Sequence, residues 1–259
     1  MSGGAPFAGI DLRRVEEIGL NALQTQRQMF YDGWLLRVSP GKAKRARSVS
    51  AHFGSTLPLA QKIPYCERVY AACGLPVLFR ITPFVQPTGL EAELAARGYQ
   101  SFEDTLVQLT RLDRPPDASS VPGVEFVTPS PVVFAEAVGE LQRSTAEQRA
   151  ALLERVAHTP LTTRAMIATA DGQPVGTGTV MLEDQFAGVY SMVTAPAMRS
   201  RGIASGILAA LLRWAWEHGA THAYLQVSAD NHGAISVYRR FGFVDAYTYH
   251  YRGRPDECH

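Results

Sequence analysis

A turn that joins a β-prone run directly to a long amphipathic helix constrains the fold of this chain most. Residues 186–194 have the composition of a strand, and residues 203–218 repeat apolar side chains at helical spacing. The first backbone N–H groups of such a helix have no partner within it, and the helix dipole is positive there. Gly202 and the small residues after it let a ligand approach the backbone closely. With Arg199 and Arg201 beside it, this turn predicts a diphosphate site.

Hydrophobic periodicity beyond residue 123 predicts alternating strands and helices, which is typical of an α/β protein. The expected strands are residues 124–127, 163–169, 175–182, 186–194, 223–228 and 243–251. The expected helices are residues 132–142, 146–158, 203–218 and 232–241. Asp171-Gly172 between two of the strands is a hairpin signal.

A change of composition at residues 112–122 divides the chain, because prolines and serines replace apolar residues there. We therefore expect an N-terminal domain at 1–115 and a C-terminal domain at 123–259. The two halves contain a weak sequence repeat, since the spacing Leu-x-x-x-Leu-x-x-x-Gly-Tyr at 90–99 matches Ala-x-x-x-Tyr-x-x-x-Gly-Phe at 234–243. This repeat suggests an internal duplication.

Two ordered motifs between residues 191 and 243 resemble a known family. Arg199-x-x-Gly202-x-Ala204 resembles the R/Q-x-x-G-x-G/A motif of the GNAT superfamily of N-acetyltransferases, and residues 225–243 resemble its second block. The resemblance implies an α/β (α+β) fold of two GNAT-like halves. Each half would have a mixed, mostly antiparallel sheet with flanking helices, and the C-terminal half would have a splayed parallel strand pair. The N-terminal half would be degenerate, because it lacks the first motif. Its nearest counterpart of the diphosphate turn is the basic run at residues 38–48, which has no Arg-x-x-Gly-x-Gly/Ala pattern.

The resemblance also implies transfer of an acetyl group from acetyl-CoA to a primary amine of a small molecule, by direct attack on the thioester. The coenzyme would lie between strands 186–194 and 223–228. The residues that would hold it are Met192, Val193, Arg199, Ser200, Arg201, Gly202, Ile203, Ala204, Ser205, Asn231 and Tyr238. Tyr238 would also act as the general acid for the departing thiolate. Structural alternatives are a core-packing role for Tyr238 and a helix N-cap role for Asn231.

The proton acceptor and the substrate site are less well defined by the sequence. Strand 186–194 has no carboxylate where many relatives place a glutamate. Glu183 and Asp184 at the preceding turn are candidates, and a water chain is an alternative, so we assign no base. Arg37, Arg45, Arg47 and Arg143 are candidate substrate-binding residues. The first three could clamp a substrate carboxylate, or they could belong to a solvated loop.

Composition narrows the function classes further. Lys and Arg total 25 against 24 Asp and Glu, and the net charge of +1 gives no field for nucleic acid or an anionic membrane. The three cysteines show no metal-ligand spacing and favour a reduced, cytoplasmic setting. Residues 1–10 lack a basic segment followed by an apolar stretch, so we expect no signal peptide. A protein lysine or N-terminal acetyltransferase and a non-catalytic acetyl-CoA-binding regulator stay open as alternatives. The acceptor, the acyl length and a homodimeric state also stay open.

Overall fold

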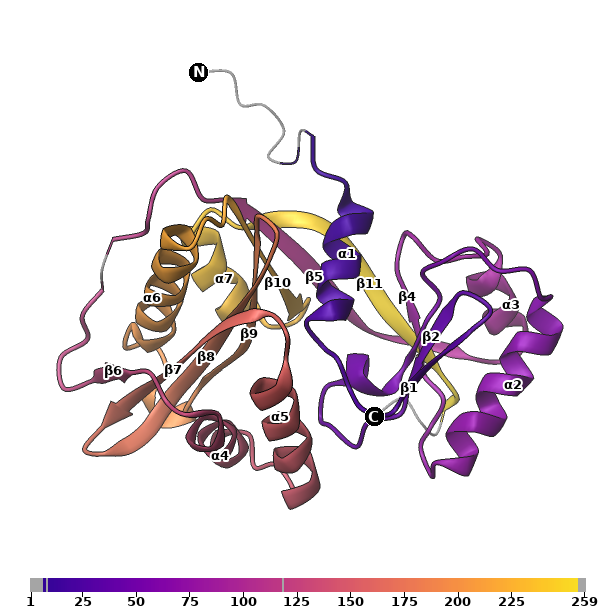
Figure 1. Cartoon of the computed structure of the whole chain (residues 1–259), viewed down its shortest axis with the longest axis horizontal. Coiled ribbons are helices and arrows are strands. Elements are labelled where there is room, and N and C mark those ends of the chain that lie inside the picture. The colour runs from indigo at the N-terminus through magenta and orange to yellow at the C-terminus, as the bar shows by residue number, and fades with distance from the viewer. Residues whose placement is uncertain (1–6, 8, 118, 256–259) are drawn as a thin grey trace. The chain divides into compact units, whose positions relative to one another are not determined.

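The computed structural model describes residues 7, 9–117 and 119–255, which form two compact units (Figure 1). Unit 1 comprises residues up to 24, 107–227 and 231–246. Unit 2 comprises residues 25–106, 228–230 and 247 onwards. Both units take segments from either side of the predicted linker 112–122, and the division at that linker stays a prediction.

Unit 1 contains a mixed sheet with the strand order β5-β10-β9-β8-β7-β6. The β6–β7, β7–β8 and β8–β9 pairs are antiparallel, and the β9–β10 pair is parallel. Its strands are β6 (Glu125–Val127), β7 (Thr162–Ala170), β8 (Gln173–Glu183), β9 (Phe186–Thr194), β10 (His222–Ser228) and part of β5 (Gln100–Arg111). Its helices are α1 (Leu12–Asn21), α4 (Pro131–Leu141), α5 (Ala146–His158), η2 (Pro196–Met198), α6 (Ile203–Glu217) and α7 (His232–Arg240).

Every strand and helix expected beyond residue 123 forms, because local signals define its ends. Helix α5 begins at a capping box, in which Thr145 and Gln148 satisfy each other's backbone N–H groups. The β7–β8 hairpin turns at Asp171 and Gly172, whose φ angles are +50° and +74°. Both positive values fit the tight turn that Asp-Gly predicts.

Helices α1 and α6 cover opposite faces of the sheet in unit 1. A Cβ added to Gly178 of β8 would lie 2.6 Å from Ile207 of α6. Met181 of the same strand belongs instead to a core cluster with Val15 of α1. Successive side chains of a strand point to opposite faces, so residues at odd spacing on β8 meet different helices.

Unit 2 contains a smaller mixed sheet with the order β1-β2-β3-β4-β11. Its elements are β1 (Gln28–Tyr31), β2 (Trp34–Arg37), η1 (Lys44–Arg47), β3 (Val49–Ser50), α2 (Leu59–Ala72), β4 (Phe79–Ile81), α3 (Leu90–Ala96) and part of β11 (Val244–Gly253). The β3–β4 pair is parallel, and the other pairs are antiparallel. Trp34, Phe79 and Leu94 are fully buried in a core shared with Ile63 and Tyr70 of α2.

The order of elements along the chain repeats. The series β1-β2-β3-α2-β4-α3-β5 has the same order as β7-β8-β9-α6-β10-α7-β11. Each series contains one parallel pair and opens with a hairpin that turns at Asp-Gly with positive φ angles, Asp32-Gly33 in the first series. The last strand of the second series pairs with β4 of the first. The predicted mixed sheets and flanking helices are thus confirmed. None of the described helices is long and apolar enough to cross a membrane.

Candidate functional site

Strands β9 and β10 form a fork, because they pair only over their first residues. The parallel register runs from Phe186 opposite His222 to Val189 opposite Leu225 and stops there. Beyond this point the two strands are not paired with each other, although β9 continues to Thr194 and β10 to Ser228. Backbone N–H and C=O groups in such a gap can bond to the amides of an extended ligand. The predicted splayed pair is therefore present.

A β-bulge marks the point where the fork opens. Thr179 of β8 lies opposite Tyr190 and Thr177 lies opposite Val193, so two residues of β9 face Gly178 alone. The first of them, Ser191, has a φ of +51°, and its carbonyl accepts a 3.0 Å bond from Thr177 Oγ1. The bulge turns the second residue, Met192, toward the α6 face, where its Sδ would lie 2.6 Å from a Cβ on Gly178.

The ladder between β8 and β9 shows which backbone groups face the fork. The N–H of Ala195 donates to the carbonyl of Val175 at 2.9 Å, and Val193 lies opposite Thr177 two residues earlier. The amide of Val193 therefore faces β8. Because neighbouring amides of a strand alternate, the carbonyl of Met192 and both amide groups of Thr194 face the side on which β10 lies.

The turn after β9 presents the first amides of α6 without a side-chain cap. Ser200 and Gly202 have φ angles of +62° and +85°, and Gly202 is the N-cap residue. The N–H of Gly206 is bonded within the helix, to the carbonyl of Gly202 at 2.9 Å. No side chain of the described residues caps this end, so the amides of the first turn stay available to an anion.

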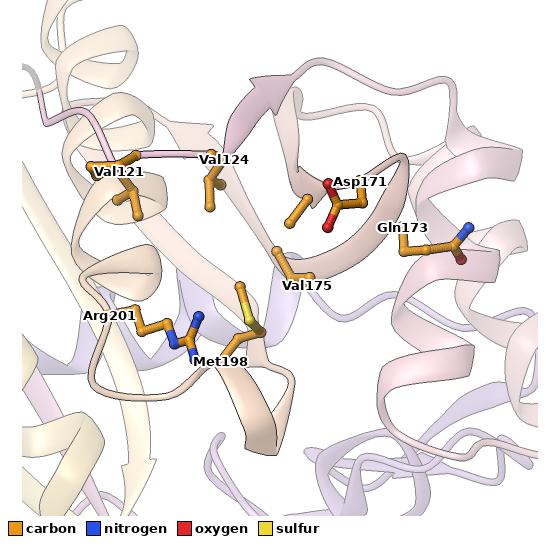
Figure 2. Close-up of a pocket in the computed structure, with 10 residues that line it drawn as sticks. Val121, Val124, Asp171, Gln173, Val175, Met198 and Arg201 are labelled. Atoms are coloured by element: carbon orange, nitrogen blue, oxygen red, sulfur yellow. The ribbon is translucent and has the colours of Figure 1, made fainter.

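Three arginines lie around this helix start. Arg199 and Arg201 are exposed on the turn, and Arg201 lines a cavity of about 670 Å³ together with Met198 and Asp171 (Figure 2). Arg240 of α7 donates from Nη2 to Ser205 Oγ at 3.1 Å, which brings a third cation to the first turn of α6. Sequence reasoning missed Arg240, because its proximity depends on how α7 packs beside α6 and no local pattern marks it.

Tyr238 lies on α7 and is 8% exposed, with its ring edge-on to Phe243. Burial raises the pKa of Tyr238 to about 12, so the phenol keeps its proton at neutral pH. No described residue forms a hydrogen bond with its hydroxyl. Asn231 accepts a 3.1 Å bond from the N–H of Ala234, so it caps α7 as the structural alternative expects.

The two acids considered as bases hold a helix in place. Arg14 Nη2 of α1 donates to Glu183 Oε1 and to Asp184 Oδ2, both at 2.8 Å, and Asn21 Nδ2 donates to Glu183 at 3.0 Å. Glu183 pairs with Phe186 at the start of β9, whereas the diphosphate turn follows Thr194. Eight residues of extended strand separate these ends by about 26 Å.

The predicted substrate arginines fall in different units. Arg37 is buried in β2, where its Nε donates to Gln28 Oε1 at 3.1 Å, and Arg45 and Arg47 lie in the short helix η1 of the same unit. Arg143 follows α4 in unit 1. Their part in substrate binding stays a prediction.

The N-terminal series has its own strand-to-helix turn, and the chain itself fills it. The basic run at residues 38–48, which the sequence suggested as the counterpart of the diphosphate turn, lies between β2 and β3. The turn that corresponds to the one between β9 and α6 is instead formed by residues 51–58, which connect β3 to α2. The Asp32 carboxylate accepts bonds from the N–H groups of Thr56 at 3.0 Å and Leu57 at 2.8 Å, and from Lys62 Nζ at 3.0 Å. A carboxylate of the protein thus occupies this anion position.

No group of three or more His, Cys, Asp or Glu side chains that could hold a metal occurs among the described residues. Cys66 is buried and Cys73 is exposed, while Cys258 lies outside the described residues.

Comparison with known proteins agrees with this geometry. The model of the acetyltransferase (GNAT) family matches residues 134–243. The chain is 27% identical over 248 residues to the uncharacterized N-acetyltransferase YobR of Bacillus subtilis (strain 168), covering 93% of this chain and 98% of that protein. A GCN5-related N-acetyltransferase from Kribbella flavida has a TM-score of 0.67 at 18% identity, covering 98% of this chain and 97% of that chain. A tandem GNAT protein from the clavulanic acid biosynthesis pathway has a TM-score of 0.59 at 16% sequence identity, and the match covers 79% of this chain and 74% of that chain.

The matched region contains the fork, the bulge, the open helix start and Tyr238. The two solved structures share the fold over most of the chain. Residues 134–243 are therefore an acetyltransferase domain of the GNAT family, which places this chain among the N-acetyltransferases.

Proposed function

We propose that this chain transfers an acetyl group from acetyl-CoA to a primary amine of a small molecule. The observation that carries the proposal is the junction of two features on one strand. Strand β9 leaves its partner β10 after Val189, and it runs directly into an uncapped helix N-terminus at Gly202. An extended arm that ends in a diphosphate fits this arrangement, because it needs amide partners along its length and an anion site at its end.

The coenzyme contacts follow from the direction of the backbone groups. The diphosphate would bind the amides between Ser200 and Ser205, with Arg199, Arg201 and Arg240 around it. The amides of the pantetheine arm would pair in the fork. Thr194 joins Met192 there, because both present backbone groups on the side of β10, whereas Val193 faces β8. Asn231 keeps its Nδ2 donors for the arm, since its Oδ1 serves the helix cap.

The chemistry would use groups at the closed end of the fork. An N–H aimed at the thioester oxygen contributes about 3 kcal/mol to a reaction of this kind. The amine nitrogen would attack the carbonyl carbon, the C–S bond would break, and the Tyr238 phenol would give its proton to the sulfur. A protonated phenol at neutral pH fits this role, because burial holds the pKa of Tyr238 at about 12.

A small, soluble acceptor and a cytoplasmic setting are part of the proposal. Protein lysine or N-terminal acetylation, and regulation without catalysis, are the alternative functions. Recognition of an acceptor carboxylate by Arg37, Arg45 and Arg47, or contact of the acceptor with Arg143, stays a prediction for the substrate site.

Calorimetry with acetyl-CoA and CoA, followed by thiol release with a pooled amine library, tests the proposal. We expect micromolar coenzyme binding and thiol release that depends on an amine. The variant Arg199→Ala/Arg201→Ala should bind CoA at least tenfold more weakly, since each charge-assisted contact contributes on the order of 1.4 kcal/mol. The control Arg68→Ala/Arg114→Ala removes two exposed arginines elsewhere and should bind normally. A wild-type protein that binds neither coenzyme form rules out the proposed function.

A further inference from the structure

We propose that Glu16 of helix α1 accepts the proton that the acceptor ammonium must lose, an inference that rests on the proposed function. The reaction needs a base, and strand β9 carries no carboxylate. Glu183 and Asp184 lie at the turn before that strand and are ion-paired with Arg14. Glu16 is 2% exposed, and it is the only buried carboxylate among the described residues.

Helix α1 places Glu16 beside the closed end of the fork. Gly19, one turn later on the helix, lies against β10, because a Cβ added there would be 3.1 Å from Gln226 Nε2 and 3.8 Å from the Tyr224 ring. Gln226 is the first residue of β10 beyond the last paired position, Leu225. Residues three apart on a helix are surface neighbours with Cβ atoms about 5–6 Å apart. Glu16 therefore lies one turn before the residue of α1 that packs beside the point where the strands separate.

The core cluster that α1 covers is mostly apolar and contains a pair of phenols. Tyr190 is the first residue of β9 beyond the paired stretch, and its hydroxyl bonds to that of Tyr224 on β10 at 2.5 Å. Both tyrosines belong to the core cluster that α1 covers. The rest of that cluster is apolar and consists of Phe7, Ile10, Leu12, Val15, Ile18, Ala22, Leu109, Leu161, Met181, Phe186 and Ala246. The charged neighbours on α1 itself are Arg13, Arg14 and Glu17, of which Arg14 and Glu17 pair with each other at 3.1 Å.

Because α1 and α6 cover opposite faces of the sheet, the coenzyme and the acceptor amine would be bound from different faces. Helix α6 holds the diphosphate turn on one face of the sheet, and α1 brings Glu16 to the other. An ammonium that reaches the thioester from the α1 face would pass its proton to the Glu16 carboxylate. The freed electron pair then forms the C–N bond, the C–S bond breaks, and the sulfur takes the proton of Tyr238. The nitrogen loses its second proton, which passes through solvent to the Tyr238 oxygen and restores the phenol. Glu16 returns its proton to water before the next turnover.

The test compares Glu16→Gln with Glu17→Gln, a matched change one position away on the exposed side of the helix. Glutamine keeps the shape of the side chain but cannot accept the proton. We expect Glu16→Gln to lose at least 100-fold in kcat, while the Kd for acetyl-CoA changes less than twofold. Its rate should rise in proportion to hydroxide, because only the fraction of amine already neutral reacts. Glu17→Gln should keep the wild-type kcat and pH profile.

A Glu16→Gln enzyme with wild-type kcat and pH profile overturns the proposal. If circular dichroism shows that Glu16→Gln is unfolded, Glu16→Asp replaces it, since aspartate keeps a base and moves it by one carbon. We expect a lower kcat with the acid limb of the profile retained, and an aspartate enzyme with unchanged kcat overturns the inference. Amine-dependent thiol release by the wild-type protein tests the proposed function independently of the Glu16 inference, because this assay does not depend on which group is the base.

Discussion

Single residues decide the chemistry at this site, and Tyr238 shows how. Its ring is held edge-on to Phe243 in the core, while no described residue bonds to its hydroxyl. Packing therefore fixes the position of the phenol, and burial keeps it protonated by raising its pKa to about 12. The core role of this side chain is therefore compatible with the proposed catalytic role.

Tyr238→Phe removes the hydroxyl and leaves the packing of the ring unchanged. We expect kcat to fall by about 10²-fold or more, with little change in the Kd for acetyl-CoA, because only the proton donor is lost. In the wild-type enzyme, kcat should show no loss from deprotonation of Tyr238 at any pH up to about 10, since the raised pKa keeps the phenol neutral in that range. Steady-state kinetics across pH 6–10 measure both effects. Tyr65→Phe in unit 2 is the control, and a Tyr238→Phe enzyme with full kcat contradicts the assignment.

Gly202→Ala tests the left-handed backbone at the helix start. The φ of +85° strains a residue with a Cβ by about 1–2 kcal/mol, although the added atom would meet only Val121 Cγ2 at 3.7 Å. We expect thermal stability to fall by about 1 kcal/mol and CoA to bind several-fold more weakly, as measured by calorimetry. Gly54→Ala is the matched control, because a Cβ added at Gly54 would meet no heavy atom within 4 Å and Gly54 has no positive φ. Equal behaviour of the two variants is inconsistent with a role for the Gly202 conformation.

At the scale of elements, the bulge in β9 connects the sheet to the ligand site. Two residues of β9 face one residue of β8, which re-aims Met192 and precedes the unpaired stretch. Thr177 stabilises the bulge by donating to the Ser191 carbonyl. The geometry of the fork therefore depends on a side chain of the neighbouring strand.

Thr177→Val removes this bond with little change in volume. We expect a loss of about 1–2 kcal/mol of stability and a several-fold rise in KM for acetyl-CoA, because the buried carbonyl loses its partner and the bulge relaxes. Thr179→Val is the control on the same face of β8, where the hydroxyl donates to the Arg164 carbonyl at 3.0 Å instead. It should lose similar stability and keep the wild-type KM. If both variants raise KM equally, the bulge is not what positions the coenzyme.

At the scale of the whole molecule, the chain contains one series of elements twice, with an open anion site in only one. The second series leaves the amides before α6 available, whereas Asp32 fills the corresponding turn before α2. Asp32 and Asp171 occupy the same place in their hairpins, and only Asp32 makes these bonds. We therefore expect one coenzyme per chain, bound by unit 1.

Asp32→Asn should destabilise unit 2 and change its response to acid. The amides of Thr56 and Leu57, with Lys62, hold the pKa of Asp32 well below its usual range. A lowered pKa in the folded state means that the carboxylate stabilises the fold above about pH 4, the range of an unfolded aspartate, and that this contribution is lost as the pH falls further. At pH 7 the variant should melt at a lower temperature than the wild type.

Calorimetric melting between pH 7 and pH 3 tests this expectation. The difference in melting temperature between wild type and Asp32→Asn should narrow toward pH 3. Asp171→Asn, the same change in the other hairpin, should leave the pH dependence unchanged. A difference that stays constant with pH contradicts the role of the charge. Binding of acetyl-CoA by Asp32→Asn should keep a stoichiometry of one.

Local patterns in the sequence predicted the elements and the proposed coenzyme site. The ends of α5 and β9 follow from a capping box and a β-prone run, and Arg199, Gly202 and Tyr238 follow from spacing within short motifs. Such signals act between residues a few positions apart, so they can be recognised in the sequence without knowledge of the tertiary packing. The counterpart expected at residues 38–48 was wrong, because a basic run does not show which strands it connects.

Tertiary structure alone decided which distant groups meet. The end of the β9–β10 pairing, the approach of Arg240 to Ser205 and the burial of Glu16 on α1 depend on contacts between residues far apart in the chain. The pairing of β11 with β4 likewise joins the end of the chain to its first series of elements. No periodicity encodes these contacts, because they arise only when whole faces of helices and strands are buried against one another.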